Sequence, residues 1–223
     1  MKRSEINQII RDAEGFVRSQ GFHLPAFAAW SPADWDGKGA EISEIRSSRL
    51  GWDVTDFGLE EFALKGVLLF TIRNGTLAQL ALGTGKLYCE KILVCQPNQL
   101  VLHHFHKAKT EDIINRGGGR LEILLQQADH DGNFNDNDLS ISLDGVSTTV
   151  KAGGIVTLHP GESITLAPYQ SHQFRALDSA VLVGEVSTVN DDANDNFFME
   201  PVGRFPKIIE DEPAYRLLCT EYA

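Results

Sequence analysis

The first hydrophobic pattern along the chain is that of an amphipathic helix. Ser4 can act as its N-cap, and Gly21 stands where the helix would end. Between them, apolar residues recur at helical spacing: Ile6, Ile9, Ile10, Ala13, Phe16 and Val17. The chain from residue 22 to residue 58 is mixed and rich in glycine, proline and tryptophan, with one further short helix predicted over 40–48. Residues 1–58 are therefore expected to form a helical and irregular extension.

After Gly58 the pattern changes to short runs of β-branched and aromatic residues separated by turn residues. Asn74-Gly75, between two apolar runs in GVLLFTIRNGTLAQLAL, predicts a β-hairpin. Further strands are predicted over 87–94, 99–106, 120–127, 139–150, 155–158, 163–166 and 180–186. Many short strands without helices between them indicate an all-β sandwich or closed antiparallel barrel, expected over 59–187. Residues 188–223 begin with the polar run NDDANDN and predict a tail packed on the barrel or on a partner subunit.

Composition and charge narrow the functional classes. The 223 residues include 31 Asp and Glu against 20 Lys and Arg, and the formal net charge of −11 would repel nucleic acid and anionic membrane surfaces. No apolar run resembles a signal peptide or approaches the roughly 20 residues of a membrane span. Three cysteines without C-x-x-C spacing indicate neither a disulfide framework nor a thiolate zinc site. We therefore expect a cytoplasmic protein with neither a nucleic-acid nor a membrane partner.

The stretch HHFHKAKTE, which begins at His103, places three of the seven histidines within four residues. On a strand, alternate side chains share a face, so His104 and His106 project to one side and His103 to the other. Glu111 can swing back across a turn, and His172 follows a second, proline-induced turn, so that three imidazoles and a carboxylate could bind one divalent metal. The residues alone leave another interpretation open, in which His104 and His106 face solvent on an edge strand and His172 is unrelated to them.

The order of these residues resembles a known superfamily. H-x-H followed by Glu, and then P-x3-H, within an all-β region is similar to the paired motifs of the cupins. Longer segments resemble the D-lyxose ketol-isomerase family: YCEKILV from Tyr88, HFHKAKTEDIINRGGG from His104, GEVSTVNDD from Gly184 and PVGRFPKIIEDEP from Pro201. The similarity extends from LGWDVTDFG to LLCTEY, which is most of the chain.

This resemblance implies a cupin fold, a double-stranded antiparallel β-barrel with an N-terminal helix and short additional helices. It also implies an enzyme that interconverts D-lyxose and D-xylulose, with D-mannose and D-fructose as a second pair. The cofactor would be one divalent metal per subunit, Mn²⁺, in a homodimer. The metal ligands would be His104, His106, Glu111 and His172.

Such an isomerase also needs a base that moves a proton from C2 to C1 of the sugar. Glu185 is flanked by apolar residues near the end of the last predicted barrel strand, where an unpaired carboxylate would be costly to bury, and it is the first candidate. Lys109 lies between two predicted metal ligands, and Lys91 lies within an apolar run, so both are further catalytic candidates. Arg204, in the tail, could reach over the cavity to bind sugar hydroxyls.

Two other functions remain open on the sequence. The same set of three histidines and one glutamate binds iron in cupin dioxygenases, whose open metal positions take oxygen and substrate. A non-catalytic, sugar-binding cupin is the third possibility. Inward-pointing charges on Lys91, Lys109 and Glu185 would favour the isomerase, whereas an apolar lining would favour the oxygenase.

Overall fold

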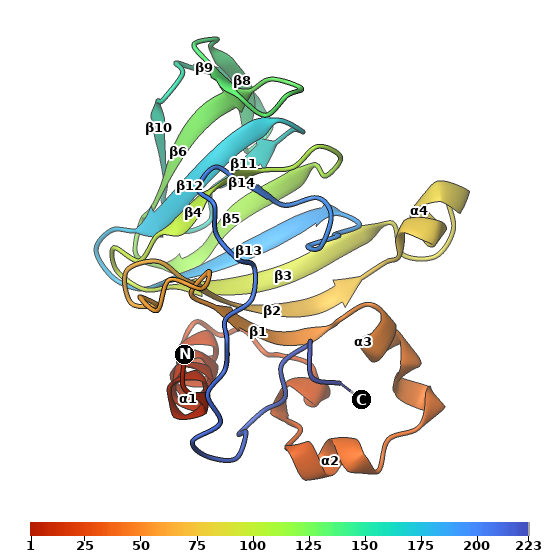
Figure 1. Ribbon diagram of the computed structural model, residues 1–223. Helices are drawn as coiled ribbons and strands as arrows, with labels where there is room; N and C mark the ends of the chain where they lie inside the picture. The colour runs from red at the N-terminus through yellow and green to blue at the C-terminus, as the bar shows by residue number, and fades with distance from the viewer. Residues whose placement is uncertain (223) are drawn as a thin grey trace.

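The structure is a computed structural model that describes residues 1–222, and it consists mainly of two curled antiparallel sheets (Figure 1). The larger sheet has eight strands in the order β1-β2-β3-β13-β5-β11-β8-β9. The smaller has six, in the order β10-β6-β12-β4-β14 with β7 paired to β6. The strands are β1 Gly51–Thr55, β2 Val67–Asn74, β3 Tyr88–Cys95, β4 Val101–Phe105, β5 Glu111–Gly118, β6 Leu121–Ala128, β7 Phe134–Asn135, β8 Leu139–Leu143, β9 Val146–Val150, β10 Ile155–Leu158, β11 Ser163–Leu166, β12 Gln170–Ala176, β13 Val181–Thr188 and β14 Phe197–Phe198.

The helices gather at the β1–β2 side of the larger sheet, apart from α4, which projects away from the barrel (Figure 1). The expected opening helix is present, but Lys2, rather than Ser4, is its N-cap. No helix in the described part of the chain is long and apolar enough to span a membrane. The helices are α1 Arg3–Ser19, η1 Ala26–Ala29, α2 Pro32–Asp36, η2 Ala40–Ile42, α3 Ser43–Ser47 and α4 Leu77–Leu82, where η denotes 3₁₀ helix.

Two hydrophobic cores lie on the two faces of the eight-stranded sheet. Val67 and Leu69 of β2 point into the space between the sheets, whereas Leu68 and Phe70 point to the outer face, which α1 covers. Ile6 of α1 is completely buried there. Because both faces of β2 are covered, its side chains are almost continuously buried, which gives the neighbouring β3 a rigid support.

The predicted hairpin at Asn74-Gly75 is wrong. β2 ends at Asn74, but the following run forms α4, and β2 pairs with β3 instead. Thr76 and Gln79 form a capping box at the start of this helix, and Gly83 ends it in the left-handed conformation with φ of 64°. The leucines and alanines between them have high helix propensity, so these local signals outweigh the Asn-Gly turn signal.

Several strands have no counterpart in the sequence prediction, and β1 and β5 are two examples that bear on the site. β1 lies in the segment expected to be helical or irregular, and it pairs with β2. β5 begins at Glu111, and its sequence EDIINRGG is too polar to resemble a buried strand. It nevertheless forms a strand, because β13 and β11 pair with it on both sides. Its polar residues are tolerated because only alternate side chains face the interior. The division of the chain at residues 58 and 187 stays a prediction.

The C-terminal tail crosses the open end of the barrel and then packs on the N-terminal segment (Figure 1). β14 adds to the six-stranded sheet at β4, with Phe198 opposite His104. Further along, the Tyr222 ring stacks on Trp35 with centroids 4.2 Å apart, and Arg3 forms ion pairs with Glu210 and Glu221. The tail therefore covers the cavity in which the predicted site residues lie.

Candidate active site

The six-stranded sheet brings three histidine side chains together inside the barrel. β12 pairs with β4 so that His172 lies opposite His104, and His106 directly follows the end of β4. The ring centroid of His104 lies 4.3 Å from that of His172 and 5.3 Å from that of His106. One nitrogen of each ring lies within 4.8 Å of the others, so the three can hold one cation. His103 instead packs against Phe134, with ring centroids 4.8 Å apart.

A backbone carbonyl orients each of these three rings. The Nδ1–H groups of His104 and His172 each donate to the carbonyl oxygen two residues earlier in the chain, at 2.6 Å and 3.2 Å. The Asp195 carbonyl holds the His106 ring in the same way. With the proton on Nδ1, the unprotonated Nε2 of each ring is free to bind a metal.

Glu111, the first residue of β5, approaches these rings from the opposite sheet. Its Oε1 lies 3.0 Å from the Nε2 of His172 and 3.5 Å from the Nε2 of His106. Within residues 1–222, neither this oxygen nor the His106 Nε2 has a hydrogen-bond partner, although both are buried. Buried lone pairs that face one another are costly unless a proton or a cation lies between them, so the four residues fit a divalent metal.

The charge states suit the same ligand set. Burial lowers the pKa of His104 well below its usual value, and repulsion from His172 and His106 lowers it further, so the ring is uncharged at neutral pH. Burial acts to raise the pKa of Glu111, but the Lys109 ammonium, 2.7 Å away, outweighs it and holds the pKa well below its usual range. The carboxylate is therefore ionised although it is buried.

A second group of charges lies beside the first, on the eight-stranded sheet. Glu185 of β13 is directly opposite Lys91 of β3, and its Oε1 lies 3.2 Å from Lys91 and 3.0 Å from Lys109. Burial acts to lower the pKa of each lysine, but nearby carboxylates raise both above their usual values. Burial acts to raise the pKa of Glu185, and the two ammonium groups lower it below its usual value. At neutral pH the carboxylate can thus accept a proton.

All the site residues predicted from the sequence line one cavity of about 50 Å³ between the sheets. They are Lys91, His104, His106, Lys109, Glu111, His172, Glu185 and Arg204. The Nη2 of Arg204 lies 2.5 Å from Asp53 and 3.4 Å from Asp192. Its Nη1 is buried and has no hydrogen-bond partner in the described part of the chain. The tail thus contributes a cation with one free donor to the cavity.

Sequence reasoning missed three residues of this site: Asp53, Asn190 and Asp192. The Oδ1 of Asn190 accepts hydrogen bonds from Lys91 at 2.9 Å and from Lys109 at 3.3 Å. Asp192 lies 3.5 Å from Lys91. Two of the three belong to NDDANDN, which we interpreted only as the polar start of the tail. Its position directly after a barrel strand was the available signal, because loops at strand ends often carry functional residues.

Comparison with known proteins identifies the family. The family model for D-lyxose isomerase matches residues 1–222. The chain belongs to the D-lyxose isomerase family. A D-lyxose/D-mannose isomerase of Serratia proteamaculans is 46% identical over 225 residues, which cover 100% of this chain and 98% of that protein. One from Escherichia coli O157:H7 is 45% identical with the same coverage.

Solved structures with a similar fold include two L-ribose isomerases. The one from Cellulomonas parahominis without ligand has a TM-score of 0.59 at 17% identity, covering 94% of this chain and 98% of that one. The one from Geodermatophilus obscurus has a TM-score of 0.58 at 16% identity, covering 91% and 94%. At such identity the similarity shows the fold alone, and the predicted all-β cupin barrel is confirmed.

As a D-lyxose isomerase family member, the protein is a sugar aldose–ketose isomerase. Such an enzyme oxidises one carbon of a small sugar and reduces its neighbour within the same molecule. The buried group of His104, His106 and His172 can hold a metal ion, which is consistent with a metal-dependent isomerase. The predictions of the family and of the enzyme class are thus confirmed.

Proposed function

We propose that the protein interconverts D-lyxose and D-xylulose, and also D-mannose and D-fructose, with one Mn²⁺ per subunit. The observation that carries the proposal is the meeting of His104, His106, His172 and Glu111 beside an ionised Glu185 in one buried cavity. The names of the D-lyxose/D-mannose isomerases that are 45% and 46% identical support the choice of sugars.

These four residues would hold a divalent cation, and fewer protein ligands than such a cation accepts would leave room for oxygens of the sugar to bind it. When bound, such a cation polarises the carbonyl and stabilises the negative charge that develops on the sugar oxygens. The proposed ligands leave the rest of the cavity free for the sugar. Their Nδ1–H bonds to backbone carbonyls hold the rings in place before the sugar arrives.

We assign the proton transfer to Glu185. Its carboxylate would take the proton from C2 and return it to C1, which requires one ionised acceptor beside both carbons. Lys109 and Lys91 keep this carboxylate ionised and offer N–H donors toward the sugar oxygens. Arg204 has a buried, unpartnered N–H on the same cavity, which supports its proposed role in binding sugar hydroxyls.

The lining of the cavity favours this function over the two alternatives. A dioxygenase for an apolar substrate has no use for two buried lysines and a buried glutamate, which are costly to bury. A protein that only binds sugar needs no carboxylate held ionised between two ammonium groups. The charged residues therefore support chemistry on a polar substrate.

The proposal is tested with metal-stripped protein to which Mn²⁺ or Fe²⁺ is returned. D-lyxose is added, and ketose formation and oxygen uptake are measured together. We expect ketose with Mn²⁺ and no oxygen uptake with either metal; oxygen uptake without ketose would support the dioxygenase. In deuterated water, deuterium at C1 of the ketose is the expected mark of proton transfer through a base. Its absence would favour a direct hydride shift.

We also propose that the enzyme is a homodimer in the cytoplasm. A groove between α1 and the β1–β2 connection carries Leu64 and Ile209, which are 62% and 57% exposed. Exposed apolar side chains in one groove support association. Light scattering should give twice the 24.6 kDa mass of the chain, and a particle of the single-chain mass would reject the dimer.

A further inference from the structure

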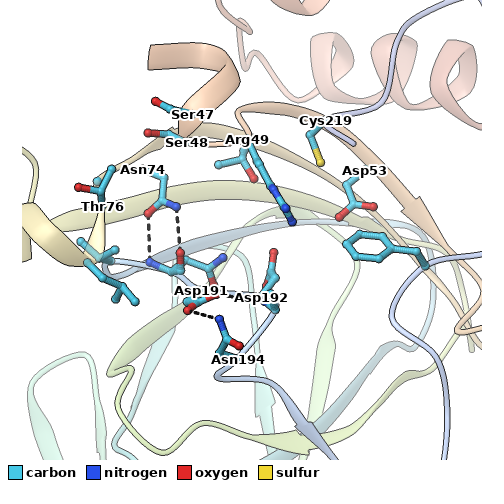
Figure 2. A pocket seen from close by; sticks show the side chains of 17 residues that line it. Ser47, Ser48, Arg49, Asp53, Asn74, Thr76, Asp191, Asp192, Asn194 and Cys219 are labelled. Carbon is cyan, nitrogen blue, oxygen red and sulfur yellow. Dashed lines mark hydrogen bonds between the residues drawn. The ribbon is translucent and has the colours of Figure 1, made fainter. Parts of the chain in front are cut away.

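A second, larger cavity lies next to the central one. It has a volume of about 320 Å³ and is enclosed by the end of α3, by β1 and β2, by the start of α4 and by residues 189–194 (Figure 2). Asp192 is the one residue among 1–222 that lines both cavities. We call this space the outer cavity. Neither the predicted metal ligands nor the predicted base line it, so it is distinct from the cavity that holds them.

The sizes of the two cavities indicate which part of a substrate each one holds. About 50 Å³ in the central cavity has room for a few atoms, but not for a sugar of about ten non-hydrogen atoms together with a cation. The outer cavity lies within the range of roughly 300 to 1,000 Å³ that is usual for small-ligand sites. Asp192 lines both cavities, so a sugar whose reacting end lies at the predicted ligands would reach the outer cavity by extending past Asp192.

Polar contacts of Asn190 and Asp192 link the two cavities, and a sugar can replace them. Asn190 lines the outer cavity, yet its side-chain oxygen accepts hydrogen bonds from Lys91 and Lys109 of the central one. Asp192 contacts Lys91 at 3.5 Å and Arg204 at 3.4 Å. Hydroxyl groups both donate and accept hydrogen bonds, so they can take the place of either partner in these contacts.

The lining of the outer cavity suits an uncharged, polyhydroxylated ligand. Small polar side chains surround it, and the Arg49 guanidinium points into it (Figure 2). Arg49 is an exposed residue, and within residues 1–222 its guanidinium has neither a hydrogen bond nor an ion pair, so its donors are free for a ligand. Arg49 also has φ of 49°, a conformation that favours glycine and that is frequent at functional sites. Three carboxylates also line it: Asp53 and Asp192 pair with Arg204, and Asp191 opposes the Arg49 cation, so the lining has no excess of positive charge for an anionic ligand such as a sugar phosphate.

We propose that the outer cavity is a subsite for the distal hydroxyls of an unphosphorylated sugar, and that Arg49 binds them. The assignment rests on the proposed function in that the reacting carbons lie in the central cavity. A hexose is one carbon longer than a pentose, so it occupies more of this subsite. The outer cavity therefore contributes more to the binding of D-mannose than to that of D-lyxose.

The first test removes the guanidinium by Arg49→Met in the metal-loaded protein. A hydrogen bond from a charged donor to a hydroxyl contributes enough that its loss should raise the KM for D-mannose about tenfold or more. The KM for D-lyxose should rise less, and kcat should change less than twofold for both sugars, because Arg49 does not contact the reacting carbons. Arg18→Met removes an exposed guanidinium from α1 and is the matched control, with no change expected.

The second test fills the cavity with Asn194→Trp, and Asn137→Trp, in another exposed loop, is its control. Binding of mannitol, which lacks a carbonyl and cannot react, is measured by calorimetry on the metal-loaded proteins. Asn194→Trp and Arg49→Met should each weaken mannitol binding about tenfold, and the two controls should not.

The outcomes separate this inference from the proposed function. If the wild type forms ketose but both outer-cavity variants keep its KM values and mannitol affinity, the subsite is wrong and the proposed function stands. If the wild type forms no ketose but binds mannitol, and both variants lose that binding, the proposed function fails and the subsite stands. Equal losses for D-lyxose and D-mannose would also overturn the assignment to the distal hydroxyls.

Discussion

The two sheets of the barrel contribute different chemistry to the cavity between them. The six-stranded sheet provides imidazoles, each tied to a backbone carbonyl. The eight-stranded sheet provides ions: Lys91 on β3, Glu111 on β5 and Glu185 on β13. Glu111 is the one proposed metal ligand that comes from the eight-stranded sheet. Apart from Glu111, the proposed metal ligands and the proposed proton-transfer group therefore come from different sheets.

The difference between the sheets has a physical reason. A neutral imidazole needs only one hydrogen-bond partner to be buried, and the backbone of its own neighbourhood can supply it. A buried ion needs an opposite charge, and removing one partner of such a pair is strongly destabilising. The charged residues therefore occur as a connected group, in which Lys109 contacts both Glu111 and Glu185.

The largest expected effect is the loss of a histidine ligand from the six-stranded sheet. His172→Ala should lower the affinity for Mn²⁺ at least about 100-fold, because substitutions of groups that merely orient ligands already cost about 10- to 100-fold. Ketose formation should fall below detection. Calorimetric titration with Mn²⁺ and an assay with D-lyxose measure the two quantities. His130→Ala, at an exposed loop position, is the control.

Glu111→Ala should resemble His172→Ala although it changes the other sheet, since both residues are assigned to the metal. If Glu111→Ala keeps its affinity for Mn²⁺, Glu111 is not a metal ligand and belongs with the proton-moving group. All the remaining proposed ligands would then come from the six-stranded sheet.

The next effect concerns the proposed base on the eight-stranded sheet. Glu185→Gln should leave Mn²⁺ affinity within about threefold, because the side chain keeps its shape and is not a proposed ligand. The kcat for D-lyxose should fall by about 10² to 10⁴, the usual scale for a lost general base. Full activity in this variant would assign the base to another group, and Lys109 and Lys91 would be the next substitutions to test.

The sequence predicted the residues of this cavity better than the elements that carry them. The alternation of HHFH on one strand was enough to separate His104 from His103, because strand geometry fixes which side chains share a face. The proline-induced turn before His172 and the cost of burying an unpaired Glu185 then added these two residues as candidates, and the family resemblance supported the set of metal ligands. Neither strand pairing nor the distance between β4 and β12 can be read from a local pattern.

The missed features depend on long-range contacts. β5 is polar in sequence and forms a strand because β11 and β13 hold it on both sides. Asp53 contributes to the site only because the C-terminal tail folds back and pairs Arg204 with it, although the two residues lie far apart in the sequence. The hairpin error was local, since the capping signals of α4 were present in the sequence and the Asn-Gly signal was preferred to them.

A smaller effect tests how the eight-stranded sheet keeps Glu185 ionised. Lys91→Met removes one of the two ammonium groups that oppose burial, so the pKa of Glu185 should rise. A base must be unprotonated to act, so the acidic limb of the kcat profile should move to higher pH. Arg73→Met, which changes an ion pair on the outside of the barrel, should leave the profile in place. An unshifted profile in Lys91→Met would mean that another group sets this limb.

The smallest effect uses the one histidine of the motif that faces away from the cavity. Burial, with repulsion from His172, lowers the pKa of His103 from 6.5 to about 4. The folded state thus favours the neutral ring, so His103 stabilises the fold above pH 6.5 and loses this contribution as the pH falls toward 4. The full pKa shift corresponds to about 3 kcal/mol in the free energy of unfolding. Solvent screens the partly exposed ring, so the expected contribution is about 1 to 2 kcal/mol.

His103→Gln should therefore lose less stability on acidification than the wild type does. Urea unfolding at pH 6.5 and at pH 4 measures the two losses, and their difference should be about 1 to 2 kcal/mol. Groups that titrate in both proteins, including the cavity histidines and the carboxylates, cancel in this difference. His130→Gln, at an exposed loop position, should show the wild-type loss. An equal loss in the wild type and in His103→Gln would mean that His103 is protonated in the folded protein at little cost. The outer face of β4 would then accept a charged ring, and only the inner face, which carries His104, would require neutral imidazoles.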